Sequence, residues 1–308
     1  TTHNSKLSPK MSAKIIDGKK VAAITRKEIK KDVKDWVNDG HRSPFLEVVL
    51  VGSNPASDVY VGAKTRACKE VGIGTHTHRL PDTISAEELK KVIRKYNRDD
   101  SVDGILVQLP LPSHLSSHDV IECIDYHKDI DGFHPMNVGR LTVGQPSFHS
   151  CTPAGIFELL KYYSIPTKGR HAVVVGASNI VGRPVSTLLS KEESFGKATT
   201  TICHKYTKDL TQHTISADII VVAAGQPNLV RGEMVKQGVV VFDVGMNRVT
   251  DETKEKGYRL VGDCHYESVK EKASWITPVP GGVGPMTVAM LMKNTLLAAK
   301  KSIYPDHQ

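Results

Sequence analysis

The chain has 308 residues, roughly two domains at ~150 residues each, and its 39% hydrophobic content, 24 glycines and 16 prolines exclude a disordered, collagen-like or low-complexity protein. Its 41 lysines and arginines against 33 acidic residues give a net charge of +8, which fits an ordinary basic surface or an anionic ligand such as a nucleotide phosphate or a polycarboxylate tail. The basic residues are spread along the chain and the longest apolar runs, 219–224 and 239–242, are short, so we expect no nucleic-acid binding and no membrane span.

The first half of the chain alternates strand-like apolar runs with amphipathic helical patterns, which is typical of α/β folds. Ser85 and Glu88 form a capping box that marks the start of one helix. A long stretch rich in glycine and proline, 128–150, is expected to be irregular and functional. The pattern predicts helices over 19–38, 58–71 and 85–96 and strands over 46–51, 75–80 and 105–109.

The second half is more regular, and its continuous apolar runs indicate strands buried on both faces of a mostly parallel sheet. Thr152 and Pro153 have the form of a helix start, and we place the domain boundary there. The first domain then covers 1–151, completed by a C-terminal helix within 286–308, and the second covers 152–285. The pattern predicts strands over 171–175, 199–203, 219–224 and 239–244 and helices over 180–189 and 287–303.

The segment 171–184 indicates a dinucleotide site. An apolar strand runs into Gly176, and Gly182 would let the following helix pack close to that strand, so that backbone N–H groups point at an anionic ligand. Ser178 replaces the second glycine of the usual motif, which leaves a turn without a ligand as the alternative. The next strand ends in 203–207 without the carboxylate that would bind the ribose of NAD.

Lys205 stands at the end of that next strand, where it can meet the 2′-phosphate of NADP. The alternative is a lysine that is merely solvated. We therefore expect NADP rather than NAD, with NAD as the second choice.

Tyr60 and Lys64 are four residues apart on a predicted helix and so share one face. Such a pair is usually surface decoration, but this helix follows the corner 52–55 at the carboxyl end of a strand, where open α/β sheets bind ligands. A lysine exchanges protons near neutral pH only when burial or a nearby cation lowers its pKa.

Three more features suit a ligand site. Gln108, near the end of its strand, needs a ligand, a partner or a bond to the following loop. Of Asp129 and Asp131, one carboxylate gripping a heterocyclic N–H donor is favoured over a metal pair, and no metal is expected. The segment 278–285 puts three glycines between prolines, which suits the close approach of a flat ligand, with Thr287 nearby.

The five cysteines are widely spaced without a CxxC motif, which indicates free thiols in a reducing compartment. Residues 1–10 are polar and lack acidic residues, and they would be an added sequence or the remainder of a processed targeting peptide. Met11 is a candidate natural start. We expect a cytoplasmic protein, with the mitochondrial matrix as the alternative.

Five motifs in order resemble the methylenetetrahydrofolate dehydrogenase/methenyltetrahydrofolate cyclohydrolase family. The resemblance runs from about residue 14 to residue 301 and rests on Y-V-G-A-K at 60–64, V-Q-L-P-L-P at 107–112, K-D-I-D-G-F-H at 128–134, G-A-S-N-I-V-G-R-P at 176–184, and the segment 278–287.

The resemblance implies an N-terminal α/β catalytic, folate-binding domain and a Rossmann-type NADP-binding domain, with folate in the cleft between them, in a homodimer. It implies two reactions: oxidation of 5,10-methylenetetrahydrofolate to 5,10-methenyltetrahydrofolate with hydride transfer to NADP, and hydrolysis to 10-formyltetrahydrofolate. Tetrahydrofolate derivatives, polyglutamylated ones included, are the implied substrates.

The resemblance also implies roles for individual residues. Lys64 would be the general acid/base of the hydrolytic step, Tyr60 would orient the folate, Gln108 would tune Lys64, and Asp131 would hold the pterin. The other residues implied to line the folate site are Val107, Leu109, Pro280, Gly281, Gly282, Val283 and Gly284. Those implied to touch the cofactor are Gly176, Ala177, Ser178, Lys205, Met246 and Thr287.

One branch of the family is mitochondrial and uses NAD with magnesium and phosphate. Ala177 stands where that branch carries an arginine for phosphate, and Lys197 where it carries an aspartate for the metal, so the resemblance favours the NADP-dependent form. Three alternatives stay open: an NAD-dependent, mitochondrial-type version of the same enzyme, another two-domain NADP oxidoreductase acting on a small acid, and a non-enzymatic anion- or nucleic-acid-binding protein.

Overall fold

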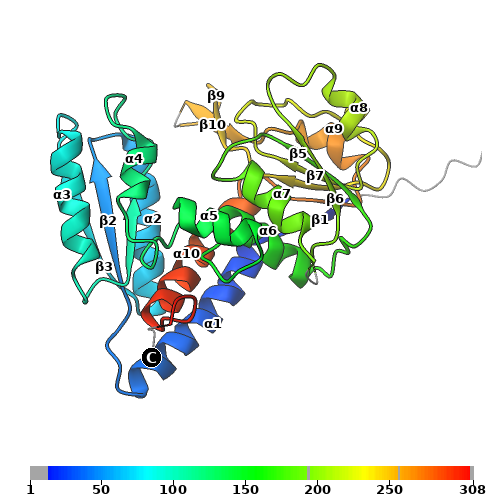
Figure 1. Cartoon of the computed structure of the whole chain (residues 1–308). Helices are drawn as coiled ribbons and strands as arrows, with labels where there is room; N and C mark the ends of the chain where they lie inside the picture. The colour runs from blue at the N-terminus through cyan, green and yellow to red at the C-terminus, as the bar shows by residue number, and fades with distance from the viewer. Residues whose placement is uncertain (1–12, 193–194, 256, 306–308) are drawn as a thin grey trace, which may run out of the picture.

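The computed structural model describes residues 13–192, 195–255 and 257–305. The segment 1–10 and Met11, whose origin the sequence left open, lie outside the described residues. The chain folds into two α/β halves that lie side by side (Figure 1), so the predicted two-domain α/β fold is confirmed.

The first half is built on a three-stranded parallel sheet of order β3-β2-β4. Its strands are β2 (Phe45–Val51), β3 (Gly74–Leu80) and β4 (Gly104–Val107), and its helices are α2 (Pro55–Val71), α3 (Ala86–Asn97) and α4 (Ser117–Glu122). β2 is central and almost wholly buried, as its uninterrupted apolar run predicts. Helix α3 starts with the predicted capping box of Ser85 and Glu88.

The second half contains a six-stranded parallel sheet of order β1-β11-β8-β7-β5-β6. Its strands are β1 (Lys14–Ile15), β5 (His171–Val175), β6 (Thr199–Cys203), β7 (Ile219–Val222), β8 (Val240–Asp243) and β11 (Trp275–Ile276). Its helices are α6 (Cys151–Tyr162), α7 (Gly182–Ser190), α8 (Leu210–Thr214), α9 (Tyr266–Lys270) and the 3-10 helix η1 (Gly232–Met234). Residues 14–15 thus add to the second sheet, and the boundary near residue 151 stays a prediction.

Two parts of the chain differ from the expectation. The stretch 128–150 is not wholly irregular, because it contains helix α5 (Pro135–Thr142). The signal for that helix was Pro135 in its first turn, preceded by His134, whose ring accepts a hydrogen bond from the Met136 N–H. The second half also carries an antiparallel hairpin, β9 (Asn247–Thr250) with β10 (Tyr258–Val261), that the apolar pattern did not predict.

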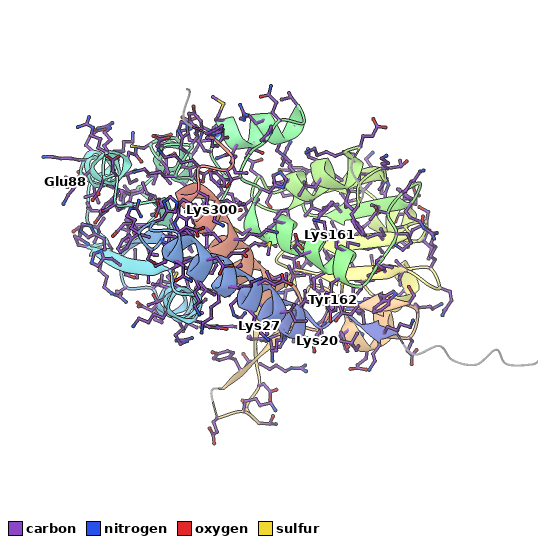
Figure 2. All side chains as sticks on the ribbon, turned by 90° about the horizontal axis from the view of Figure 1, so that it is seen from below. Lys20, Lys27, Glu88, Lys161, Tyr162 and Lys300 are labelled. Carbon is purple, nitrogen blue, oxygen red and sulfur yellow. The ribbon has the colours of Figure 1, made fainter. Side chains whose placement is uncertain are left out.

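Helices α1 (Gly18–Asn38) and α10 (Val283–Ala299) run next to one another between the two halves (Figure 1). α10 packs on α1, α2 and α6, and it begins at Val283, earlier than predicted. Two lysines of this region, Lys20 and Lys300 (both labelled in Figure 2), lie over aromatic rings. The Lys20 ammonium lies 5.8 Å from the ring centre of Tyr162 on α6, and the Lys300 ammonium lies 5.8 Å from the ring centre of Trp36 on α1. The two halves are therefore joined through packed helices.

Candidate active site

Lys64 and Gln108 meet at the carboxyl edge of the first sheet. Lys64 lies on α2, which follows β2, and Gln108 follows β4 directly. Because β2 and β4 are parallel neighbours, these two positions are brought to the same edge. The Lys64 Nζ donates a hydrogen bond of 3.0 Å to Gln108 Oε1, and the Gln108 Nε2 donates one of 2.6 Å to the Leu109 carbonyl. Gln108 is only 8% exposed, so it has both the partner and the loop bond that its position required.

Asp131 completes this polar group. Burial raises the pKa of the Asp131 carboxyl to about 6, and the positive charge of Lys64 opposes that rise. Asp129 has a different surrounding, because its carboxylate accepts hydrogen bonds of 2.8 Å from the His134 N–H and from the Asn137 amide. Asp131, by contrast, has a side-chain hydrogen bond with Cys151 and feels the charge of Lys64, so it is the aspartate that can meet a ligand beside Lys64.

The segment 278–285 is anchored to the start of α1. Gly281 has a φ of +112°, which favours glycine, and its carbonyl accepts a hydrogen bond of 3.0 Å from the Lys19 N–H. A Cβ on Gly18 would run into the Gly282 carbonyl, so the two backbones are in direct contact. Pro280 to Gly284 therefore form a fixed wall of backbone immediately before and within the first turn of α10.

Tyr60 and Met246 join the two halves across this region. The Tyr60 hydroxyl lies 3.2 Å from the Met246 Sδ, although the residues belong to α2 and to the loop after β8. Tyr60 is 46% exposed and Met246 is 39% exposed. A Cβ on Gly284 would stand 3.3 Å from the Met246 methyl, so the glycine wall reaches the same point. Residues expected to bind folate and residues expected to bind the cofactor are thus adjacent.

The predicted dinucleotide turn lies between β5 and α7. Gly176 has a φ of +121°, and a Cβ there would run into the Ala223 carbonyl, while a Cβ on Gly182 would run into the Gly176 carbonyl. The Ser178 Oγ accepts hydrogen bonds of 3.2 and 3.4 Å from the backbone N–H groups of Val181 and Gly182. This tight glycine corner at a helix start fits a pyrophosphate group.

Lys205 and Thr287, two further residues expected to contact the cofactor, differ in whether they already have partners in the protein. Lys205 is exposed after β6, and its ammonium lies 5.0 Å from the Tyr206 ring centre. Thr287 lies in the second turn of α10, and its hydroxyl forms a hydrogen bond of 2.9 Å with the Thr152 hydroxyl on α6. Lys205 is therefore available to an anionic ligand, whereas Thr287 already links two helices.

Sequence reasoning missed three buried polar residues near these features. Asn294 on α10 donates hydrogen bonds to the carbonyls of Ile130 (2.8 Å) and His149 (3.1 Å), which tie together the segments on either side of α5. Asp243 and Asp263 are buried behind the dinucleotide turn. The sequence signal was a polar residue inside an apolar pattern, which does not reveal the distant segments that it contacts.

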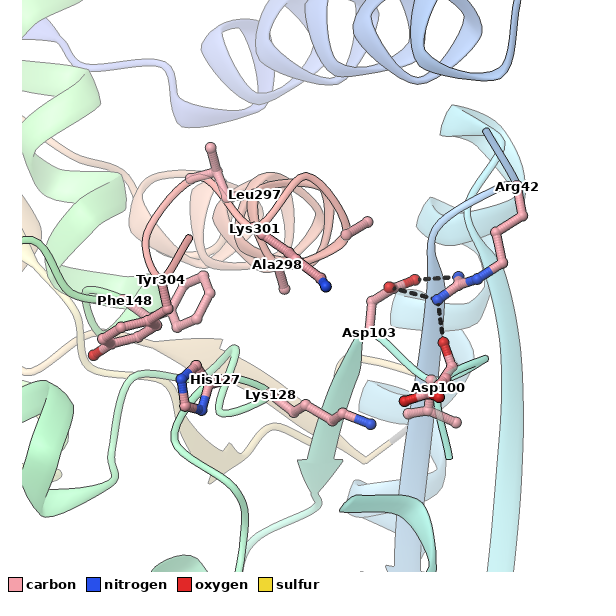
Figure 3. Close-up of a pocket in the computed structure, with 12 residues that line it drawn as sticks. Arg42, Asp100, Asp103, His127, Lys128, Phe148, Leu297, Ala298, Lys301 and Tyr304 are labelled. Atoms are coloured by element: carbon pink, nitrogen blue, oxygen red, sulfur yellow. Dashed lines mark hydrogen bonds and ion pairs between the residues drawn. The ribbon is translucent and has the colours of Figure 1, made fainter. Parts of the chain in front are cut away.

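A cavity of about 600 Å³ lies beside Asp103, at the end of β4 opposite to Gln108 (Figure 3). Three of its charged groups have partners within the protein: the Arg42 guanidinium binds both Asp103 oxygens at 2.7 and 2.8 Å, and the Lys128 ammonium donates to the carbonyls of Tyr96 and Asp99. None of the predicted site residues lines this cavity, so it is not the predicted site.

Within residues 13–192, 195–255 and 257–305, no three histidine, cysteine, aspartate or glutamate side chains gather in a way that could hold a metal ion. In the same part of the chain, no helix has the length and apolar character needed to cross a membrane.

The first sheet carries a polar site around Lys64, and the second carries a glycine turn of the kind that binds nucleotides. Together they define a two-domain, nucleotide-dependent enzyme. The sequence model of the tetrahydrofolate dehydrogenase/cyclohydrolase catalytic domain matches residues 16–131, and that of the NAD(P)-binding domain of the same family matches residues 150–303. The chain belongs to the tetrahydrofolate dehydrogenase/cyclohydrolase family, and the predicted resemblance is confirmed.

Relatives match over nearly the whole length. The bifunctional protein FolD of Phocaeicola vulgatus is 51% identical over 290 residues, covering 94% of this chain and 99% of the relative. The solved structure of bifunctional FolD from Campylobacter jejuni is 49% identical with a TM-score of 0.89, covering 94% of this chain and 100% of the other. That of the Trypanosoma brucei dehydrogenase-cyclohydrolase, complexed with NADP and an inhibitor, is 38% identical with a TM-score of 0.89, covering 96% of this chain and 99% of the other.

Proposed function

We propose that this protein oxidises 5,10-methylenetetrahydrofolate to 5,10-methenyltetrahydrofolate and hydrolyses the product to 10-formyltetrahydrofolate. The observation that carries this proposal is the hydrogen bond of 3.0 Å between Lys64 and Gln108 beside the half-buried Asp131. This contact supports the proposal because an amine able to transfer protons lies near a carboxyl able to hold a heterocycle, in a chain of the tetrahydrofolate dehydrogenase/cyclohydrolase family.

The hydrolytic step needs a group that takes and returns protons. Water adds to the one-carbon bridge of the methenyl cation and loses its first proton, which leaves a hydroxyl on that carbon. The bond from the carbon to N5 then breaks as the hydroxyl loses its proton and becomes the formyl C=O, while N5 gains a proton. One proton is released overall. The Lys64 amine, held by Gln108, would move these protons, while Asp131 accepts N–H donors of the pterin and Tyr60 orients it. Val107, Leu109 and the backbone of 280–284 would line the folate.

NADP is the cofactor that we propose, and when bound it accepts the hydride. Gly176, Ala177 and Ser178 would hold its pyrophosphate, and Lys205 its 2′-phosphate. Met246 would contact it from the loop after β8, and Thr287 would support it from α10. Ala177 and Lys197 replace the arginine and aspartate expected of an NAD-dependent mitochondrial form, which supports NADP over NAD.

We propose a homodimer in the cytoplasm, with the mitochondrial matrix as the alternative compartment. Its substrates would be folates with or without polyglutamate tails, which the net charge of +8 suits. Size-exclusion chromatography with light scattering measures the oligomeric state, and a monomer would contradict the proposal.

The test of the proposed function is the growth of methenyltetrahydrofolate absorbance from methylenetetrahydrofolate. NADP⁺ and NAD⁺ are compared side by side, with and without magnesium and phosphate. We expect turnover with NADP⁺ that is independent of both additions. Absence of turnover with either nucleotide overturns the proposed function, and turnover with NAD⁺ that requires magnesium and phosphate overturns the choice of NADP.

A further inference from the structure

Two buried carboxylates lie behind the dinucleotide turn. Asp243, at the end of β8, is 3% exposed, and Asp263, which follows β10, is 0% exposed. No salt bridge among the described residues involves either of them. A buried carboxyl group without a cation is costly and persists only when N–H donors satisfy it.

Asp263 fixes the turn after β7. Its Oδ2 accepts hydrogen bonds of 2.7 Å from the Ala224 N–H and 2.8 Å from the Gly225 N–H. The preceding carbonyl, that of Ala223, fills the space where a Cβ on Gly176 would stand. The carboxylate of Asp263 therefore controls the backbone against which the pyrophosphate-binding turn is packed.

The two carboxylates also hold Met246 from both sides. The Asp243 Oδ1 accepts a hydrogen bond of 3.0 Å from the Gly245 N–H, and the Asp263 Oδ1 accepts one of 2.8 Å from the Asn247 amide. Asp243 in turn accepts a hydrogen bond of 2.9 Å from the Asp263 N–H. Met246, whose sulfur touches the Tyr60 hydroxyl, is thus bracketed by two fixed neighbours.

Glycine is required at the two positions where these carboxyl groups pack directly against the backbone. A Cβ on Gly245 would overlap the Asp263 carboxyl, and a Cβ on Gly262 would overlap that of Asp243. The backbone around the pair therefore follows the carboxylates closely, and a change in either group must move the loops that it binds.

We propose that Asp263 is a positioning residue for the nicotinamide dinucleotide, because its carboxylate sets both the 223–225 turn beneath Gly176 and, through Asn247, the Met246 side chain. This inference rests on the proposed dehydrogenase function. Its consequence is a separation of the two reactions. Lys64, Gln108 and Asp131 lie in the first half of the chain, and hydrolysis of methenyltetrahydrofolate needs no nucleotide.

The test is the substitution Asp263→Asn in the full-length protein. Asparagine keeps the size of the side chain, but it removes the charge and turns an NH2 group toward N–H donors. NADP⁺ binding is measured by isothermal titration calorimetry, and hydrolysis of added methenyltetrahydrofolate is followed by its absorbance. We expect the Kd for NADP⁺ to rise about tenfold or more, with cyclohydrolase kcat/KM within about twofold of wild type. An unchanged Kd overturns the inference.

Asp251→Asn is the matched control, because that carboxylate lies in the hairpin and bonds locally to Thr253. We expect it to leave both readouts unchanged. Asn247→Ala removes one hydrogen bond to Asp263, and it replaces Asp263→Asn as the test variant if Asp263→Asn does not fold. It should raise the Kd for NADP⁺ about threefold while sparing hydrolysis.

The inference is also overturned if a folded Asp263→Asn protein loses NADP⁺ binding and hydrolysis equally, since equal losses show a purely structural role. The same criterion applies to Asn247→Ala where that variant is the test. Wild-type protein that binds neither NADP⁺ nor NAD⁺ contradicts the proposed function itself. The failure of the positioning role and the failure of the proposed function are thus told apart.

Discussion

The Lys64 ammonium and the Gln108 amide oxygen are joined by a hydrogen bond of 3.0 Å although 44 residues separate them in the chain. The bond exists because α2 and the loop after β4 both leave the sheet at its carboxyl edge. It fixes the end of a flexible side chain in one position, which is what proton transfer to a bound substrate needs.

Lys64→Met should abolish cyclohydrolase activity while the fold survives, because methionine keeps the length of the side chain and removes the amine. We expect cyclohydrolase kcat to fall by a factor on the order of 10²–10⁴, the range typical of a positioned general acid or base. The rate of methenyltetrahydrofolate hydrolysis measures the loss, and far-ultraviolet circular dichroism verifies the fold. Lys69→Met, at an exposed position of the same helix, is the control and should hydrolyse normally. Normal hydrolysis by the Lys64 variant would show that the proton-transfer role is wrong.

Gln108→Met should lower cyclohydrolase kcat by less than Lys64→Met, about tenfold, since the amine remains but loses its hydrogen-bond acceptor. The double variant should be no slower than Lys64→Met alone, because the two residues act as one unit. Steady-state kinetics on the four proteins give this comparison. Additive losses would mean that Gln108 acts on the substrate independently of Lys64.

Asp131 should make the stability of the protein depend on pH. Burial raises its pKa to about 6 from an ordinary 3.8, so the folded chain holds this proton more tightly than the unfolded chain. The stabilisation from that proton is fully present below pH 3.8 and is lost as the pH rises through about 6. Wild type should therefore lose stability relative to Asp131→Asn between about pH 4 and pH 7. Thermal denaturation of both proteins across this range measures the difference, and parallel curves would contradict the assignment.

The regular part of the fold could be predicted because its signals are local. The strands His171–Val175 and Thr199–Cys203 have the predicted bounds, since an apolar run between turn residues specifies a buried strand by itself. Helix α5 and the hairpin β9–β10 were missed because short polar elements depend on contacts with the rest of the fold.

The predicted site follows the same division. Motif positions identified Lys64 and Gln108, and the structure brings them together. Asp263 and Asn294 could not be found from the local sequence pattern, because each forms hydrogen bonds with backbone groups far away in the sequence. Asp263 and Ala224 are 39 residues apart, and Asn294 and Ile130 are 164 residues apart. A side chain of this kind is defined by the folded structure and not by its own neighbours.

Lys205→Ser should weaken NADP⁺ without weakening NAD⁺, because only NADP carries the 2′-phosphate that Lys205 is proposed to meet. We expect KM for NADP⁺ to rise about tenfold and KM for NAD⁺ to change by less than about twofold. Lys208→Ser, an exposed lysine three residues further on, is the control for a general loss of positive charge. Equal effects of both variants would show that Lys205 acts only through the net charge.

Asn294→Leu should disturb the folate site from a distance. Leucine has a similar volume but no N–H donors, so the carbonyls of Ile130 and His149 lose a partner inside the protein. Each such loss costs about 1–3 kcal/mol, and urea denaturation should show a destabilisation of that order. Because Ile130 precedes Asp131, we also expect KM for the folate substrate to rise while the Kd for NADP⁺ stays constant. Asn38→Leu, exposed at the end of α1, controls for the substitution itself. A destabilised variant with an unchanged folate KM would limit Asn294 to holding the fold together and would remove it from the positioning of Asp131.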